Sequence, residues 1–329
     1  MTALAALLMV ATFAKGLGNV ENVTRSVESQ LKLIRRVTFS VGGTHSDLEI
    51  ASDGTAIYFI ENVAEGMVLK RVSFNDGIPH IVARFESAFI GRVFSIPGDS
   101  ERLIVAKLYG DAAAPWDLVF LSLTRREETQ IDVGQEGSDG RVVMSPAGQL
   151  FGLGTRYQCV MVLDHRLCGV NAFSVFDAKN GKVVWSFPLP REKVSSQAWE
   201  NSSPSDSRGE IFVARTVQKA GWLGDDALAL GTSGAAPQFS WIELRRHSDG
   251  LWSESRLKTA DVPERRQQLS PGDRVITLRR GKRKSRFRAG DFGAEWLICG
   301  GDRVVVGREV RVGWAIDRVE VSVFEWKNK

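Results

Sequence analysis

The sequence of 329 residues contains little cysteine and little histidine, three and four residues respectively. Three cysteines are too few for the disulfide framework that stabilises small secreted domains. The four histidines are scattered along the chain and show no metal-binding spacing such as H-E-x-x-H; they are His45, His80, His165 and His247. The sequence therefore predicts no metal site.

Motifs of the common catalytic and nucleotide-binding sites are also missing. The chain contains no G-x-S-x-G nucleophile elbow and no P-loop. Gly152 and Gly154 lack the third glycine and the helix of a dinucleotide-binding fingerprint. We therefore predict no catalytic residue and no cofactor.

The N-terminal segment Met1–Ala14 carries no charged side chain, but it is shorter than the roughly 20 apolar residues that span a bilayer. It resembles the apolar core of a secretory signal, although no Lys or Arg precedes it. Three interpretations stay open: a signal peptide, the remnant of an anchor helix, or a buried N-terminal segment. We predict that residues 1–30 form this segment and a linker, and that the protein is exported to the periplasm, the envelope or the medium.

The excess of positive over negative charge comes from one segment. The formal net charge is +4, and removing seven basic residues between positions 279 and 288 leaves −3 for the rest; these seven are Arg279, Arg280, Lys282, Arg283, Lys284, Arg286 and Arg288. Clustered cations bind phosphate, anionic lipid or nucleic acid. The alternative is a solvated hairpin loop between a strand at Val275–Leu278 and one near Trp296–Cys299. Because the rest of the chain is acidic, we expect weak contact with an anionic surface at most, and no general nucleic-acid binding.

Short apolar runs separated by turn residues indicate strands after residue 31. Glycine is abundant, with 32 residues against 10 prolines, as in a fold with many tight turns. Val319, Val321 and Val323 alternate with polar residues, which places them on one face of a strand. The only candidate helix is Asn19–Gln30.

The strand pattern repeats. Asp53-Gly54, Pro97-Gly98-Asp99 and Pro146-Ala147-Gly148 each precede an apolar run, a second apolar run and a further turn. A weaker copy begins at Gly224-Asp225. Starts near Gly54, Gly98 and Gly148 lie 44 and 50 residues apart, which are typical periods of a propeller blade.

We therefore predict an all-β fold, a β-propeller of four-stranded antiparallel sheets that occupies residues 31–329 as a single domain. Stacking around an axis buries both faces of each sheet and leaves only short edges. Six blades fit the repeats best, with five or seven as alternatives. A two-layer sandwich array is the competing fold.

The first repeat, Asp53-Gly54-Thr55-Ala56-Ile57-Tyr58-Phe59 followed by Val68–Val72 and Asp76-Gly77, resembles the PD40 (TolB-like, WD40-like) repeat of bacterial propellers. The resemblance extends over about Asp47–Phe187. Phe176–Trp185 also resembles one quinoprotein repeat. These residues are structural, so the resemblance implies an architecture and no particular activity. It further implies an exported protein that contacts other proteins.

The function that the sequence favours is a non-catalytic interaction platform, because rigid blades present loops and loops carry recognition. The partner is predicted to be a protein, bound by a monomeric propeller at its mouth. Two alternatives stay open: an enzyme acting on a carbohydrate or small molecule, and an extracytoplasmic sensor domain. Tryptophans such as Trp185, Trp222 and Trp252 are expected to pack between blades.

Cys159 and Cys168 have eight residues between them in a segment that is able to fold back on itself. In an exported protein they could form a disulfide bond. In a reducing compartment they would be packing thiols.

Overall fold

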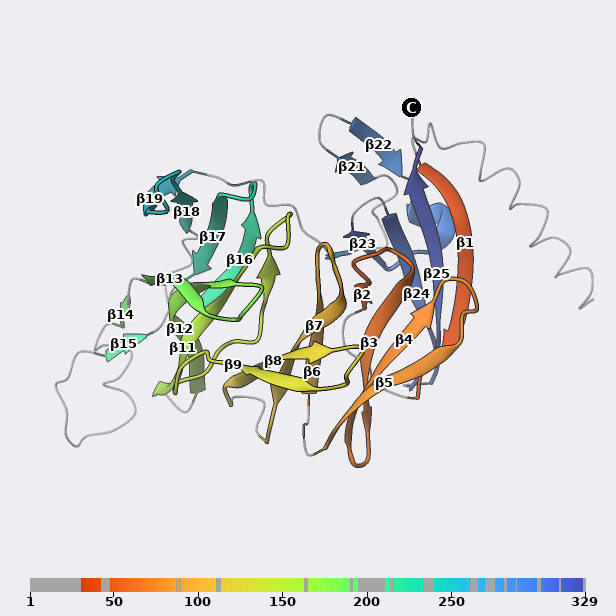
Figure 1. Ribbon diagram of the computed structural model, residues 1–329, viewed down its shortest axis with the longest axis horizontal. Helices are drawn as coiled ribbons and strands as arrows, with labels where there is room; N and C mark the ends of the chain where they lie inside the picture. Colours follow the sequence, from red (N-terminus) through yellow and green to blue (C-terminus); the bar gives the residue numbers. More distant parts are fainter. Residues whose placement is uncertain are drawn as a thin grey trace, which may run out of the picture. The chain divides into compact units, whose positions relative to one another are not determined.

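The structure, a computed structural model, describes residues 31–42, 48–86, 88, 90–110, 114–162, 165–189, 192–194, 211–213, 216–233, 240–258, 260, 266–269, 276–280, 283–287, 289–300, 303–313 and 315–327. These residues form strands almost throughout (Figure 1). In the described ranges the one helical element is the 3-10 turn η2 (Ala289–Phe292), and none is long and apolar enough to cross a membrane. The helix expected at Asn19–Gln30 and the apolar segment at 1–14 lie outside the described residues.

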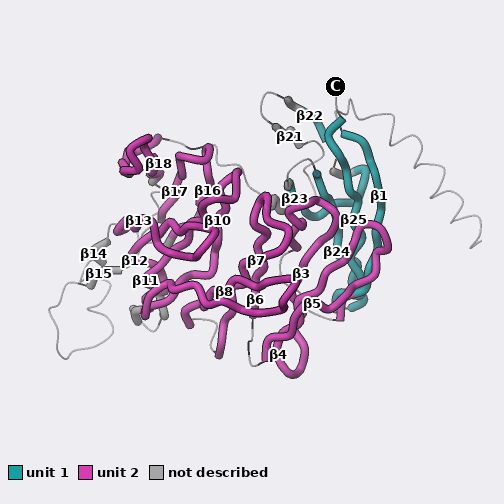
Figure 2. The backbone as a smooth tube through the Cα atoms, in the orientation of Figure 1, with its two compact units in different colours: residues 1–40, 266–329 teal, residues 41–265 magenta. Residues whose placement is uncertain are grey.

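The chain divides into two compact units (Figure 2). Unit 2 comprises residues 41–265, and unit 1 comprises residues 1–40 and 266–329. Each is described by itself below.

Unit 2 contains four consecutive four-stranded antiparallel sheets, each with its strands in sequence order. The first blade comprises β2 (Glu49–Ile50), β3 (Ala56–Val63), β4 (Gly66–Ser73) and β5 (Pro79–Glu86). The second comprises β6 (Ile90–Ile96), β7 (Asp99–Leu108), β8 (Trp116–Ser122) and β9 (Glu128–Ile131). The third comprises β10 (Val143–Met144), β11 (Leu150–Val162), β12 (His165–Asp177) and β13 (Val183–Pro188). The fourth comprises β16 (Thr216–Trp222), β17 (Ala227–Ser233), β18 (Ser240–Arg246) and β19 (Trp252–Leu257). Between the third and fourth blades, β14 (Glu192–Val194) and β15 (Ile211–Val213) form a separate two-stranded ribbon.

The blades pack face to face, and strand β7 shows how. Its Leu103 and Val105 lie in a core with residues of the first blade, whereas Ile104 and Ala106 lie in a core with residues of the third. A third core joins the third and fourth blades. Alternate residues of a strand point to opposite faces, so both faces of this sheet are buried. The propeller prediction is confirmed by this arrangement, while the number of blades stays a prediction.

The repeats that the sequence predicted are the turns of these blades. We call the turn between the first and second strands of a blade its AB turn, and the turn between the third and fourth strands its CD turn. The predicted starts at Gly54, Gly98 and Gly148 are AB turns with positive φ. Gly77 and Gly181 occupy CD turns, also with positive φ.

Unit 1 contains a five-stranded sheet in the order β1-β25-β24-β23-β20. Its strands are β1 (Leu31–Ser40), β20 (Arg266–Gln268), β23 (Trp296–Gly300), β24 (Arg303–Val312) and β25 (Ala315–Trp326). The alternation predicted near the end is confirmed, because Val319, Val321 and Val323 are buried. A register shift between Leu33 and Arg35 interrupts the pairing of β1 with β25.

The predicted loop of basic residues is wrong in its local structure. Residues 276–280 and 283–287 form the paired strands β21 (Ile276–Arg280) and β22 (Arg283–Phe287), and β23 pairs with β20 and β24 instead. Leu278 and Phe287 are buried in the core of unit 1. These buried side chains fix the hairpin, because apolar burial favours a strand over a solvated loop here.

We predict that Gly148→Ala destabilises the fold much more than Gly98→Ala. Both glycines have positive φ, +70° and +77°, which costs an L-residue about 1–2 kcal/mol. A Cβ at Gly148 would lie 2.0 Å from the carbonyl oxygen of Pro97 in the neighbouring blade, whereas a Cβ at Gly98 meets nothing within 4 Å. The expected loss is about 3 kcal/mol or more for Gly148→Ala, measured by urea unfolding. Equal losses in the two variants would contradict the close approach of these turns.

Candidate functional site on the turn face

In a four-stranded meander the AB and CD turns lie at the same end of the sheet. In unit 2 these ends are joined by hydrogen bonds from blade to blade, so the turns form one surface. We call this surface the turn face. Loops carried by a rigid scaffold are the usual location of binding residues, and the turn face is therefore the candidate functional site.

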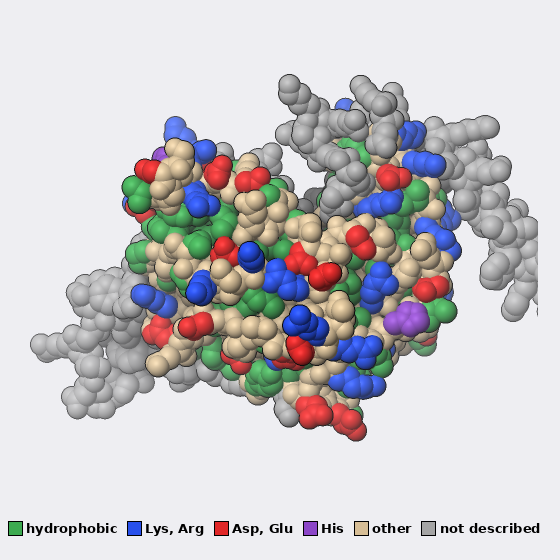
Figure 3. All heavy atoms as spheres, in the orientation of Figure 1, with side chains coloured by type: hydrophobic (Ala, Val, Ile, Leu, Met, Phe, Trp, Pro, Cys, Tyr) green, Lys and Arg blue, Asp and Glu red, His purple; other side chains and the backbone are tan. Residues whose placement is uncertain are grey.

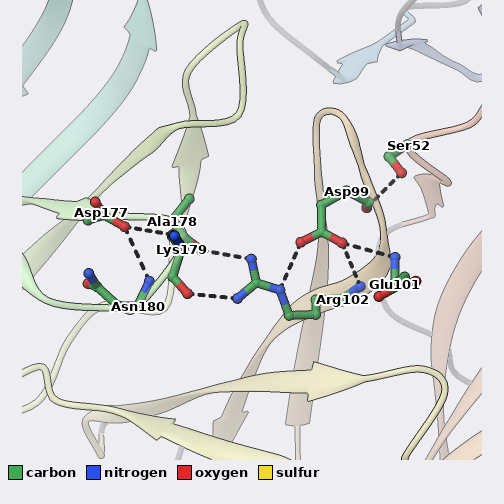
Figure 4. A network of polar contacts seen from close by, with 8 residues as sticks. All are labelled: Ser52, Asp99, Glu101, Arg102, Asp177, Ala178, Lys179 and Asn180. Carbon is green, nitrogen blue, oxygen red and sulfur yellow. Dashed lines mark hydrogen bonds and ion pairs between the residues drawn. The ribbon is translucent and has the colours of Figure 1, made fainter.

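Arg102 connects the second blade to the third on the turn face (Figure 4). Its Nε donates to Asp99 Oδ2 at 2.8 Å, and its Nη1 donates to the Lys179 carbonyl at 2.9 Å. Its guanidinium also lies over the ring of Phe120, 5.1 Å from the centroid. The planar fork of arginine is suited to holding several acceptors at once. One side chain therefore fixes the AB turn of one blade to the CD turn of the next.

Two further bonds extend this row in both directions. Ser52 Oγ of the first blade donates to the Asp99 carbonyl at 2.8 Å. The Ala147 N–H of the third blade donates to Asp225 Oδ1 of the fourth at 2.8 Å. Turns from all four blades are thus held in a fixed arrangement.

Charged residues also gather where the chain enters the third blade. The guanidinium of Arg92, on β6, lies 4.6 Å from the centroid of the Trp116 ring. Arg141 Nη1 donates to the Val217 carbonyl of the fourth blade at 3.3 Å, and its N–H donates to Asp139 Oδ1 at 3.1 Å. The positive charges of Arg92 and Arg141 both act on the Asp139 carboxylate. We call Arg92, Asp139 and Arg141 the inner charge cluster.

The pKa of Asp139 reflects its surroundings. Burial raises this pKa to about 6, against the opposing effect of the Arg141 N–H and the two guanidinium charges. Burial disfavours the charged carboxylate, and nearby cations favour it. The effect of burial prevails, so the pKa of Asp139 lies above its ordinary value.

The structure leaves most of the predicted basic residues without a described side chain. Arg279, Arg280, Arg283 and Lys284 have a described backbone only, Lys282 and Arg288 lie outside the described residues, and Arg286 is exposed. The hairpin register places Arg279 opposite Lys284 and Arg280 opposite Arg283. Binding of an anionic partner by these basic residues therefore stays a prediction.

Cys159 and Cys168 lie directly opposite each other on β11 and β12 and form a disulfide bond in the structure, with their Cα atoms 4.1 Å apart. Whether the bond forms in the cell depends on export, which stays a prediction. Cys299 is free, and burial raises the pKa of its thiol to about 11.

The histidines do not come together in the part of the chain that is described. His80 Nε2 lies 3.7 Å from Asp76 Oδ2, and His247 Nε2 lies 2.8 Å from Ser253 Oγ. His45 lies outside the described residues, and the side chain of His165 is not described. Within the described ranges no group of three His, Cys, Asp or Glu residues could hold a metal ion.

Sequence reasoning missed Arg92, Asp99, Arg102, Asp139 and Arg141. Asp99 and Asp225 belong to turns that the repeats identified, so their positions were available from the pattern. The partners of Arg102 lie 76 and 77 residues away, and no local signal connects them.

No family model and no curated protein matches the sequence. Solved structures do match in part. TolB from Acinetobacter baumannii is 11% identical with a TM-score of 0.39, and the match covers 87% of this chain and 58% of TolB. An oligogalacturonate lyase in complex with manganese is 10% identical with a TM-score of 0.43, covering 88% of this chain and 97% of the lyase. The PQQ-bound aldose sugar dehydrogenase of Streptomyces coelicolor is 10% identical with a TM-score of 0.41, covering 89% of this chain and 98% of the dehydrogenase.

Two of the solved structures that match are TolB proteins, whose repeat the sequence resembles. The likeness concerns the fold alone. This chain spans 58% of the length of the TolB structure.

We predict that Asp139→Asn removes part of the pH dependence of stability. The folded-state pKa of about 6 lies above that of an unfolded aspartate, about 3.9. Asp139 therefore stabilises the fold most below about pH 4, and this contribution is lost as the pH rises through about 6. Relative to wild type, Asp139→Asn should gain about 1–3 kcal/mol in unfolding free energy between about pH 4 and pH 7.5.

Urea unfolding at both pH values measures this gain. The control is Asp249→Asn, which removes one carboxylate from an exposed turn where Asp249 Oδ1 accepts the Leu251 N–H. If Asp139→Asn and wild type differ equally at both pH values, the Asp139 carboxyl does not titrate as described.

Proposed function

We propose that this propeller is a non-catalytic interaction platform that binds another protein on the turn face. The observation that supports the proposal best is the row of bonds from Ser52 through Asp99 and Arg102 to Lys179. A surface whose loops are already fixed loses little conformational entropy on binding, and this favours affinity. The proposal includes export and a monomeric state.

We predict that charge reversal on the turn face abolishes capture of a protein partner. Lys179 and Arg125 are exposed residues of CD turns, and the double variant Lys179→Glu, Arg125→Glu changes this face without touching the core. The matched control is Arg84→Glu, Arg256→Glu, which reverses two exposed charges on fourth strands away from the CD turns. The chain is used as bait in nuclease-treated extract of the native host, and mass spectrometry identifies what binds.

A defined protein that is captured by wild type and the control, and lost by the turn-face variant, supports the platform. Equal capture by both variants would remove the turn face from the proposal. A chain that captures no protein, but whose melting temperature rises with a sugar or small molecule, would favour the enzyme alternative instead.

The basic hairpin is the second proposed contact, with an anionic surface. Its register sets like charges directly opposite each other, which is unfavourable between paired strands. An anionic partner would relieve this repulsion.

Replacing Arg283, Lys284 and Arg286 by Gln should leave the unfolding free energy within about 0.5 kcal/mol, because surface changes usually cost little. The same variant should sediment less with phosphatidylglycerol vesicles at low salt, where electrostatic attraction is strongest. Phosphatidylcholine vesicles are the control. A sharp loss of stability would show that these side chains are structural, and unchanged sedimentation would rule out the contact.

A further inference from the structure

Charge is divided unevenly between the two units. Unit 1 contains 20 Lys and Arg and 10 Asp and Glu, a formal net charge of +10, whereas unit 2 contains 23 and 29, a net charge of −6. The two segments of unit 1, residues 1–40 and 266–329, stand at opposite ends of the chain and form one unit only in the fold. The overall charge of +4 is therefore the balance of a basic unit and an acidic unit.

The basic excess of unit 1 comes from two elements. Seven basic residues lie between positions 279 and 288, in and beside the β21–β22 hairpin, and neither this segment nor β1 contains an acidic residue. The basic residues of β1 are Lys32, Arg35 and Arg36. All other residues of unit 1 together contain ten basic and ten acidic residues, so their charges balance.

The carboxylates next to β1 are already paired with arginines of the same sheet. Glu325 stands directly opposite Lys32 in the register, and its Oε1 lies 3.1 Å from Arg303 Nη1. This row of three strands therefore has two cations and one carboxylate. The other ion pairs of β24 and β25 are Arg308–Glu320, Arg311–Glu309 and Arg318–Asp317. Since each joins one cation to one carboxylate, these strands do not cancel the charge of β1.

Strand β1 is an exposed edge of the five-stranded sheet. Its three basic residues are exposed, and Ile34 is 39% exposed. The register shift between Leu33 and Arg35 falls at Ile34, so three consecutive residues, 34–36, are exposed. Lys and Arg side chains lie along β1 at the right of the view in Figure 3. Charges on an edge strand prevent pairing with another sheet, but that role does not require charges of one sign.

The hairpin has a buried face and an exposed face. Leu278, Ser285 and Phe287 are buried, whereas Arg286 is exposed. Because alternate residues of a strand occupy opposite faces, Arg279 and Lys284, which are paired in the register, belong to the same face as Arg286. Leu278 and Phe287 share one core with Leu31 of β1. Both basic elements are thus held by the same core.

We propose that unit 1 binds the surface of an anionic lipid bilayer and that β1 takes part in this contact together with the hairpin. The inference rests on the proposed contact of the hairpin with an anionic surface, and adds its chemistry and a second element. Each basic residue near an anionic bilayer strengthens binding about fivefold. The same surface repels the negative charge of unit 2, which favours binding through unit 1.

The side chains beside these cations favour a bilayer over a nucleic acid. Proteins that bind single-stranded nucleic acids combine cations with exposed aromatic rings that stack on the bases. In unit 1, the large hydrophobic residues found exposed among the described residues are Ile34 and Val312, both aliphatic. Segments that lie at a membrane surface combine basic residues with apolar side chains that enter the interface. Ile34, directly before Arg35 and Arg36, fits this second pattern.

The test is sedimentation of the whole chain with phosphatidylglycerol vesicles at low salt. The β1 variant is Lys32→Gln, Arg36→Gln. The matched control is Arg84→Gln, Arg256→Gln, which removes two exposed cations from edge strands of unit 2 and has the same net charge as the β1 variant. A further variant, Lys32→Arg, Arg36→Lys, changes the same positions and keeps their charge. Circular dichroism melting checks that all variants fold.

The β1 variant should bind the vesicles at least about tenfold more weakly than wild type. The control and the variant that keeps its charge should bind as wild type does, and added salt should weaken binding of wild type. Equal weakening of the β1 variant and the control would show that net charge decides, and would overturn the inference. Unchanged binding by the β1 variant, equal binding to phosphatidylcholine vesicles, or tighter binding to an oligonucleotide duplex or single strand would overturn it as well.

The hairpin variant Arg283→Gln, Lys284→Gln, Arg286→Gln separates this inference from the contact on which it rests. If that variant loses binding while the β1 variant binds as wild type does, the hairpin contact stands and the role of β1 is wrong. If wild type does not sediment with phosphatidylglycerol vesicles, the hairpin contact fails too. The protein-binding platform of unit 2 is tested independently, by capture from host extract.

Discussion

In unit 2 the second and third blades bury both faces of their sheets against the neighbouring blades, and the rest of the unit depends on this constraint. Strand β7 contributes Val105 to one core and Ile104 to the next, so no face of that sheet is free for polar side chains. With the faces of such a sheet buried, its exposed surface is at the ends of the strands and along the edge strands. A binding surface in this fold must be built at those places, and the turn face is the one where all four blades contribute.

The apolar cores have little directional preference, because burial of hydrophobic surface depends mainly on area. Hydrogen bonds between side chains and the backbone fix the relative positions of the turns more precisely. Arg102 fixes two turns at once, and the close contact of Gly148 with the Pro97 carbonyl sets how near neighbouring AB turns approach. Both residues act on the second and third blades. Gly148 permits the AB turns of these blades to approach closely, and Arg102 joins the two blades by hydrogen bonds.

The fold could be predicted largely because its signal is local. Gly54, Gly98 and Gly148 mark turns that only a repeated meander spaces so regularly, and the alternating valines of β25 follow from the period of a strand. The inner charge cluster could not be predicted, since Arg92 and Asp139 are brought together by blade packing and belong to different repeats. The hairpin of basic residues was missed for a related reason. Its charged residues indicated an exposed loop. The burial of Leu278 and Phe287, which stabilises the hairpin, can be recognised only once the residues that pack against them are known.

The same constraint explains why the tryptophans between the third and fourth blades are unusual. Where blade packing alone decides, large apolar side chains are buried, as Phe151 and Phe176 are between the second and third blades. Between the third and fourth blades, Trp185 and Trp252 stack on each other and stay half-buried, and Val184, Leu223 and Leu251 beside them are exposed. Exposed aliphatic groups gain nothing from the blade core, and polar residues at these turn positions would keep the fold equally well. These exposed groups border turns of the turn face, where packing of the blade core does not decide which residue type is present.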